Sequence, residues 1–207
     1  MKETILLVDA GHGGLDPTTG EYKTPPKYGK KFNFKTGIYH NNSSWFYEGY
    51  SNRVIASEFI AQASRAGFIC VPVFQPSEDT SLMRRINLAN QYYKEVNKNC
   101  IFLSFHSNAF KSYHRGLQAY HYPNSLKGKA IAKAIIATTQ KTFINYDSIE
   151  AYPLRTAKFA VLRATIPPAV LLELGFFDNR ADADLLIDNE FRADVVASIV
   201  AGLNNIL

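Results

Sequence analysis

The sequence predicts a single α/β domain, spanning residues 1–207, built on a mainly parallel, twisted sheet of about six strands with helices on both faces. Two observations lead to this prediction. Short apolar runs alternate with longer segments of helical period, which is the pattern of βαβ units. A chain of 207 residues with 46% hydrophobic and 20% charged residues also has the length and composition to bury one core of its own.

The short apolar runs are expected to be the strands, and the segments with a helical period are expected to be the helices. The last segment illustrates the period, since Val195, Ile199 and Leu203 recur every four residues and would place one helix face on the sheet. The expected strands lie near 4–9, 68–74, 100–105, 116–122, 158–162 and 168–173. The expected helices lie near 46–66, 81–97, 127–143, 180–187 and 190–205.

Residues 15–47 do not fit this alternation and are expected to be an inserted loop. The segment is rich in Gly, Pro, Lys, Asn and aromatic residues and shows no sustained period. Loops of this length in compact domains are usually functional or disordered, and the aromatic content argues against disorder. The loop is therefore expected to have a function.

Composition and charge exclude several classes of protein. A net charge of +5 is a weak attraction to polyanions, and no nucleic-acid motif accompanies it, so no nucleic acid is expected as a partner. No apolar run is long enough to span a membrane, and the apolar start stops at Asp9, short of a secretory signal. Cys70 and Cys100 lie in apolar runs and are expected to be buried free thiols.

Two histidines follow apolar strands and are candidates for metal ligands. His12 lies in a glycine-rich turn after the first strand, and His106 follows the run 101–105. The carboxyl ends of parallel strands meet at one edge of a sheet, where such sheets bind ligands, so the two imidazoles are expected to converge. The other histidines are less well placed, because they lie in the long loop, in a polar stretch or near the end of a strand: His40, His114 and His121.

A catalytic zinc site needs a third protein ligand, and Glu48 is the candidate. It begins the expected helix, and one face of that helix carries Ile55 and Phe59, so the carboxylate lies at the top of a buried stripe. An acid at a helix start can equally be there because it interacts favourably with the helix dipole. Glu21 is the rival carboxylate, but it lies in the irregular loop.

Glu173 is the candidate catalytic acid and base. It follows the apolar run 168–172, and a buried carboxylate there needs a metal, a water or a cation beside it. As a general base, it would take a proton from a metal-activated water. The alternative is a strand-end carboxylate that caps a neighbouring helix.

These residues belong to motifs that together resemble the zinc-dependent N-acetylmuramoyl-L-alanine amidases, the peptidoglycan amidases of the D-x-G-H-G-G type. The resemblance covers nearly the whole chain, although the 35 residues between His12 and Glu48 are more than is common in the family. The matching motifs are Asp9-Ala10-Gly11-His12-Gly13-Gly14, Glu48 with Asn52, Arg85 with Ala89-Asn90, Ser104-Phe105-His106-Ser107-Asn108-Ala109 followed by Gly116, and Pro168-Ala169-Val170-Leu171-Leu172-Glu173-Leu174-Gly175-Phe176 with Asn179.

The resemblance implies a site, a cofactor and a substrate. One zinc ion per chain would be held by His12, Glu48 and His106, with Glu173 as the catalytic residue. The substrate would be peptidoglycan, cut at the amide between N-acetylmuramic acid and L-alanine. The residues expected to contact the substrate are Asn108, Asn52, Trp45 and Tyr39, the last two through their aromatic rings.

Three further interpretations accompany this one. A zinc peptidase or deacetylase would use the same four groups on another amide, and a non-catalytic wall-binding module would need neither the full ligand set nor Glu173. The protein is expected to be a monomer. Because no signal peptide is visible, it is expected to be made in the cytoplasm and to reach the cell wall or periplasm after release or injection, as a lysin does.

Overall fold

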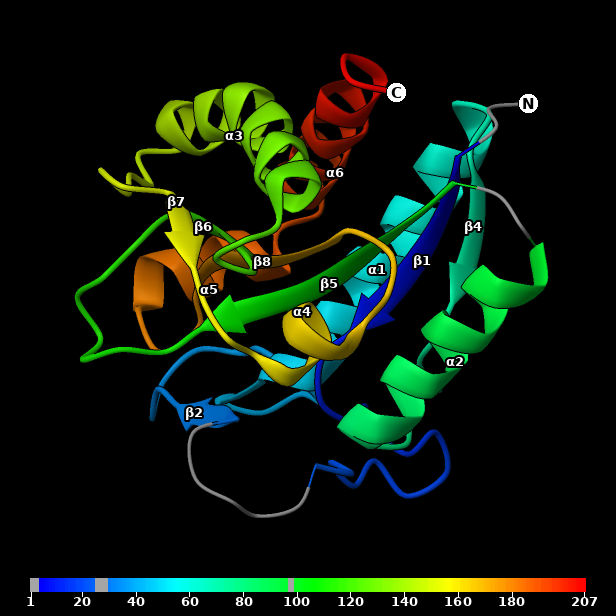
Figure 1. Ribbon diagram of the computed structural model, residues 1–207. Helices are drawn as coiled ribbons and strands as arrows, with labels where there is room; N and C mark the ends of the chain where they lie inside the picture. The colour runs from blue at the N-terminus through cyan, green and yellow to red at the C-terminus, as the bar shows by residue number, and fades with distance from the viewer. Residues whose placement is uncertain (1–3, 25–29, 97–98) are drawn as a thin grey trace.

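Three apolar strands form the centre of a six-stranded sheet in the computed structural model, which describes residues 4–24, 30–96 and 99–207 (Figure 1). β1 (Ile5–Ala10), β5 (Cys100–Asn108) and β8 (Ala169–Phe176) run parallel and lie side by side. β4 (Ile69–Pro72) pairs parallel with β1, and β6 (Leu117–His121) pairs antiparallel with β8 and parallel with β7 (Leu154–Thr156) at the other edge. The predicted α/β class with a mainly parallel sheet is confirmed.

Helices cover both faces of this sheet (Figure 1). α1 (Glu48–Arg65), α3 (Leu126–Asn145) and α6 (Asn189–Asn204) pack on one face, and α2 (Leu82–Val96) and the short α4 (Ala160–Ala164) pack on the other. α5 (Arg180–Ile187) joins β8 to α6. All six residues of β1 are buried because the sheet is covered on both sides.

The predicted stripe on α1 is present, and it fixes the helix on the sheet. Ile55, Phe59 and Ala63 are buried, and the Phe59 ring lies 4.9 Å from the Phe105 ring of β5, measured between centroids. Because Glu48 is the first residue of the same helix, this packing brings its carboxylate to the carboxyl ends of β1 and β5.

One predicted strand is wrong. Residues 158–162 do not form a strand; α4 begins within this run, and the edge strand is β7, a few residues earlier. A short apolar run does not distinguish a strand from a buried helical turn. Here the adjacent residues Val161 and Leu162 are both buried, and the turn that buries them is helical. The other predicted strands and all five predicted helices are present; α5 has the predicted ends and the others are shifted by a few residues at most. Residue 97, the expected end of α2, lies outside the described residues.

The described parts of the segment 15–47, residues 15–24 and 30–47, contain more regular structure than the sequence predicts. β2 (Lys31–Asn33) and β3 (Trp45–Tyr47) form an antiparallel hairpin that leads directly into α1. Aromatic rings of the segment pack in series, with 4.7 Å between the centroids of Phe34 and Tyr39 and 5.8 Å between those of Phe46 and Phe177, which follows β8. Much of the aromatic content therefore anchors the segment to the domain.

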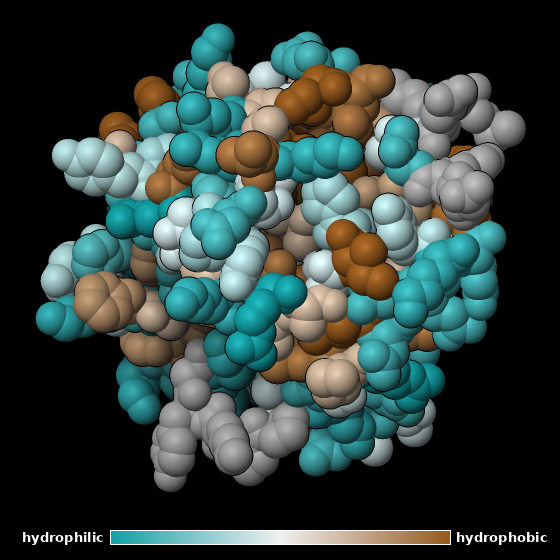
Figure 2. All heavy atoms as spheres, viewed as in Figure 1, coloured by the Kyte–Doolittle hydropathy of each residue, from teal (hydrophilic) through white to brown (hydrophobic). Residues whose placement is uncertain are grey.

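The surface carries hydrophobic residues in separate groups. On the side shown in Figure 2, hydrophobic atoms lie scattered among hydrophilic ones. Leu82 and Met83 at the start of α2 are among the exposed large hydrophobic residues, with relative exposures of 57% and 62%. Within the described ranges, no helix is both long and apolar enough to cross a bilayer.

Candidate metal centre and active site

The turn after β1 places His12 beside β5 because two glycines allow a close approach. His12 has a left-handed backbone with φ of 62°. A Cβ on Gly11 would lie 2.0 Å from Cε1 of His106, and a Cβ on Gly49 would lie 2.0 Å from the carbonyl oxygen of Gly13. The His106 ring therefore lies on the backbone of the turn, and the start of α1 lies against it.

Two arginines hold the His12 turn in this conformation. Arg53 and Arg85 both donate from Nη2 to the carbonyl oxygen of His12, at 2.6 Å and 2.9 Å. Arg85 is buried and also pairs with the buried Asp9, whose Oδ2 accepts a hydrogen bond of 2.6 Å from Ser104 Oγ. The charges of Arg85 and Asp9 thus compensate each other, and the Arg53 guanidinium is satisfied by backbone carbonyl oxygens, so the buried network can fix the turn.

His12, Glu48 and His106 converge on one point at the carboxyl edge of the sheet. Glu48 Oε1 lies 3.2 Å from His12 Nε2 and 3.1 Å from His106 Nδ1. One candidate ligand atom from each residue lies within 4.8 Å of the others, and the two imidazole rings are perpendicular, at 87°. The structure thus brings together all three residues that the sequence analysis named as metal ligands.

The protonation states around this cluster suit metal binding. Burial opposes ionisation of Glu48, but the neighbouring His12 and His106 outweigh it and hold the pKa of the carboxyl well below its ordinary value. Burial lowers the pKa of His106, although Glu48 opposes the shift. A carboxylate and a neutral imidazole are the forms that bind metals.

The cluster also has a ligand atom without a hydrogen-bond partner. His12 Nε2 is buried and makes no hydrogen bond among the described residues, whereas the buried Glu48 Oε2 has an ion-pair partner in the ammonium nitrogen of Lys30, 3.4 Å away. Buried polar atoms are rarely left without a partner. Two imidazole nitrogens and one carboxylate oxygen form one of the ligand sets of catalytic zinc, so these residues fit a bound metal ion.

Glu173 lies next to the cluster on the same face of the sheet. It is paired in register with His106 on β5, and its Oε2 is buried without a hydrogen-bond partner. Burial raises the pKa of Glu173 well above its ordinary value, the nearby charge of Glu48 raises it further, and Lys30 opposes the shift. The raised pKa shifts the titration of this carboxyl toward neutral pH, which is the direction that a general acid and base requires.

A row of polar side chains, the polar strip, continues from Glu173 across β6. Gln118 faces Glu173 in the antiparallel register. Gln118 Oε1 accepts hydrogen bonds from Asn108 Nδ2 at 3.0 Å and from the Tyr120 hydroxyl at 2.8 Å, and Gln118 Nε2 donates to Glu150 Oε2 at 2.9 Å. Sequence reasoning missed Gln118 and Glu150, although the alternation of Leu117, Gln118, Ala119 and Tyr120 marks Gln118 as a residue of the face opposite Leu117.

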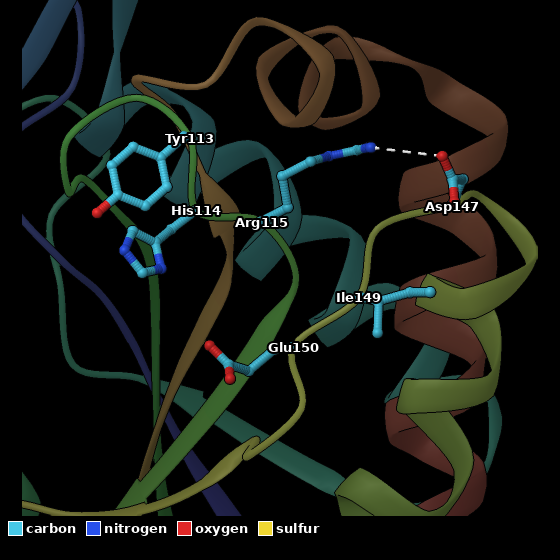
Figure 3. Close-up of a pocket in the computed structure, with 6 residues that line it drawn as sticks. All are labelled: Tyr113, His114, Arg115, Asp147, Ile149 and Glu150. Carbon is cyan, nitrogen blue, oxygen red and sulfur yellow. Dashed lines mark ion pairs between the residues drawn. The ribbon is translucent and has the colours of Figure 1, made fainter.

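The polar strip ends at a cavity of about 370 Å³ between the loop after β5 and the loop after α3. Figure 3 shows Glu150 on one side of the cavity and His114 on another. Arg115 points away from Glu150 toward Asp147, with which it forms an ion pair at 3.7 Å. The cavity is lined by Tyr113, His114, Arg115, Asp147, Ile149 and Glu150.

The residues expected to contact a substrate lie in different surroundings. Asn108 belongs to the polar strip. Asn52 is buried and donates to the carbonyl oxygen of Gly11 at 3.3 Å, so it supports the ligand turn, and its contact with a substrate stays a prediction. The Tyr39 hydroxyl donates to Asp184 on α5 at 2.7 Å, and Trp45 lies under the ammonium group of Lys31. Neither ring has a contact with the metal cluster among the described residues, and their role in binding stays a prediction.

The rival candidates Glu21, His40 and His121 do not belong to the ligand cluster. Glu21 is bonded to Lys23 at the surface. His40 is buried and accepts a hydrogen bond of 2.8 Å from the Tyr47 N–H group, and His121 lies 2.8 Å from the carbonyl oxygen of Tyr122. These contacts account for each residue without a metal.

Comparisons with known proteins agree with this geometry. The family model described as N-acetylmuramoyl-L-alanine amidase matches residues 6–205. The chain is 27% identical over 211 residues to an uncharacterized cell wall amidase of Bacillus anthracis, and 26% identical over 204 residues to the probable cell wall amidase LytH of Staphylococcus saprophyticus. These matches cover 98% of this chain in each case but only 35% and 58% of the two relatives.

Solved structures with the same fold include amidase domains. The catalytic domain of CwlV, an N-acetylmuramoyl-L-alanine amidase from Bacillus (Paenibacillus) polymyxa var. colistinus, superposes with a TM-score of 0.72 at 23% identity, covering 98% of this chain and 97% of that one. An N-acetylmuramoyl-L-alanine amidase from Clostridium difficile 630 superposes with a TM-score of 0.73 at 22% identity, covering 99% and 97%. At these identities the likeness establishes the fold.

Proposed function

Because the chain belongs to the N-acetylmuramoyl-L-alanine amidase family, we propose that it uses one zinc ion to hydrolyse the amide bond between N-acetylmuramic acid and L-alanine in peptidoglycan. The convergence of His12, Glu48 and His106 beside Glu173 is the observation that carries this proposal, because it joins a zinc ligand set to a proton-transfer group. The place of action is then the cell wall, outside the cytoplasmic membrane.

Zinc, when bound by His12, Glu48 and His106, supplies a Lewis acid that polarises the scissile carbonyl and activates water at neutral pH. Glu173 takes a proton from the attacking water and donates a proton to the nitrogen of the leaving group. A C–O bond forms and the C–N bond breaks, so the products are the lactyl carboxylate of N-acetylmuramic acid and the free amino group of L-alanine. Arg53, Arg85 and Asn52 keep the His12 turn in place.

We further propose that the substrate lies along the polar strip. Asn108 and Glu150, which are linked through the buried Gln118, place amide and carboxylate groups between Glu173 and the cavity of about 370 Å³, and their remaining donor and acceptor capacity can pair with peptide N–H and C=O groups. We also propose that the described parts of the segment 15–47 contribute to substrate binding, since the chain leaves the fold just after His12 and returns at Glu48.

Digestion of purified peptidoglycan tests the proposed function. The protein as purified is expected to contain close to one zinc ion per chain and to release peptides with a free N-terminal L-alanine, identified by mass spectrometry, and a chelator is expected to stop the release. A peptidase would produce other new N-termini, a deacetylase would release acetate, and a wall-binding module would sediment with the polymer without cutting it. Any of these three results would contradict the proposal.

A further inference from the structure

The two oxygens of the Glu48 carboxylate face different groups. Oε1 faces the nitrogens of His12 and His106 at 3.2 Å and 3.1 Å, whereas Oε2 lies 3.4 Å from the ammonium nitrogen of Lys30. Glu48 is only 1% exposed, while the Lys30 side chain is 40% exposed and reaches it from the rim. One oxygen of the carboxylate is thus directed at the metal point and the other at a cation.

The backbone of Lys30 is fixed to the start of α1. Its carbonyl oxygen accepts hydrogen bonds from the N–H group of Glu48 at 3.1 Å and from the hydroxyl of Tyr22 at 3.0 Å. The same hydroxyl accepts a hydrogen bond of 2.9 Å from the N–H group of Gly49. Since β2 begins at Lys31 and pairs with Tyr47, the hairpin holds Lys30 beside Glu48 from the other side as well. The position of Lys30 is therefore built into the fold.

We propose that Lys30 is a positioning residue for the metal centre: its ammonium group holds Oε2 of Glu48 so that Oε1 alone is directed at the ion bound by His12 and His106. This inference rests on the proposed function, because it assigns Lys30 a task at the zinc site. It gives part of the segment 15–47 a role in the chemistry.

The physical reason is the freedom of a carboxylate ligand. A glutamate can rotate about its last bond and can bind a metal through one oxygen or both, and a catalytic zinc site must keep one position open for water. Groups that bind the other side of a metal ligand orient it, and their loss typically weakens metal affinity or activity about 10- to 100-fold. Lys30 has the charge and the fixed backbone to orient Glu48 in this way.

A purely electrostatic role for Lys30 predicts the opposite change in zinc affinity. If Lys30 were only a positive charge near the ion, its removal would relieve repulsion and tighten metal binding, because like charges repel through the partly buried site. If Lys30 orients Glu48, its removal weakens metal binding. The direction of the change therefore separates the two explanations.

The experiment measures the zinc dissociation constant in competition with a chromophoric chelator, without substrate. Lys30→Met is expected to weaken zinc binding about 10- to 100-fold, while Lys30→Arg retains most of the affinity because it keeps a donor and a charge. Lys31→Met is the matched control, since Lys31 lies next in the chain but reaches over the Trp45 ring at 4.8 Å, and it is expected to bind zinc as the wild type does. Thermal unfolding checks that each variant is folded, and Lys30→Gln replaces Lys30→Met if that variant does not fold.

Zinc binding by Lys30→Met that is as tight as, or tighter than, that of the wild type would overturn the inference. Equal weakening in Lys31→Met would overturn it too, because the effect would then belong to the hairpin as a whole. A protein that shows the expected pattern but releases no peptide from peptidoglycan would support the inference and refute the proposed activity. A wild-type protein that binds no zinc would overturn both.

Discussion

Replacement of Glu173 by Gln separates proton transfer from metal binding. Glutamine has nearly the same shape but cannot take a proton from water, so kcat is expected to fall about 10²- to 10⁴-fold, which is about 2.7–5.4 kcal/mol of the activation free energy. Zinc content is expected to stay at the wild-type value. Glu173 Oε2 makes no hydrogen bond among the described residues, and the ligand set of His12, Glu48 and His106 does not include it.

The same replacement is expected to change stability with a defined pH dependence. The pKa of Glu173 is raised above its ordinary value of 4.5 by burial and by the charge of Glu48. As the pH rises past 4.5, the unfolded chain loses this proton before the folded chain does. The free energy of unfolding of the wild type therefore falls between pH 4.5 and the raised pKa. Glu173→Gln has no such proton, and the metal-free variant is therefore expected to be the more stable protein above about pH 4.5 and equal to the wild type below it.

Three measurements test this prediction: steady-state release of peptides from peptidoglycan, zinc content of the purified variant, and urea unfolding of the chelated proteins between pH 4 and 8. Loss of zinc from Glu173→Gln would refute the assignment, because Glu173 would then be a ligand. Retention of more than a tenth of wild-type kcat would also refute it. The matched comparison is Glu48→Gln, which is expected to lose zinc affinity instead.

Two further predictions concern the ligand turn and the segment 15–47. Gly11→Ala places a methyl group 2.0 Å from the His106 ring and is expected to displace that ring. Zinc affinity is expected to fall at least about tenfold, while the circular dichroism spectrum stays that of a folded protein. Unchanged zinc affinity would contradict the proposed packing. Burial, with a smaller effect from Arg192, lowers the pKa of His40 from 6.5 to about 4. The free energy of unfolding therefore keeps its full contribution from neutral His40 above about pH 6.5. This contribution, up to about 3 kcal/mol, is lost as the pH falls toward 4. Urea unfolding between pH 4 and 8 is expected to show a flatter pH profile for His40→Gln, whose side chain can still accept from the Tyr47 N–H group, and an unchanged slope would contradict this.

The central strands and the first helix could be predicted because their sequence patterns have one physical solution. β1 and β8 are apolar except for one acid each, Asp9 and Glu173, as expected of strands that are covered on both faces, and α1 shows a buried stripe at a helical period. The run 158–162 gave the wrong element because four of its five residues, 159–162, are apolar or small, and so short a run can form either a strand or a buried helical turn. The hairpin of β2 and β3 could not be predicted, since its strands have three residues each and no period can be read from them.

The metal cluster could be predicted as a set, whereas its supporting residues could not. His12 and His106 end neighbouring parallel strands, so topology alone brings them together. The contacts of Lys30 with Glu48 and of Gln118 with Glu150 join residues that are distant in sequence and have no motif of their own. Only the folded backbone determines that such side chains meet.

The long separation between His12 and Glu48 in the sequence does not disturb the cluster because the chain between them is anchored at several points. The Gly14 N–H group donates to the carbonyl oxygen of Ser77 at 2.7 Å, and the Lys23 N–H group donates to that of Gly14 at 2.9 Å. At the other end, Glu48 donates to Lys30. Closing a longer flexible loop adds only about 0.6 kcal/mol for each doubling of its length, and these anchors divide the segment into shorter loops.

Ligand spacing along the chain is thus weakly constrained, while the stripe on α1 and the two glycines that let the rings approach constrain the site strongly. A segment inserted between two ligands can therefore be ordered, be anchored at both ends and bring a residue such as Lys30 to the metal centre without changing the ligand set.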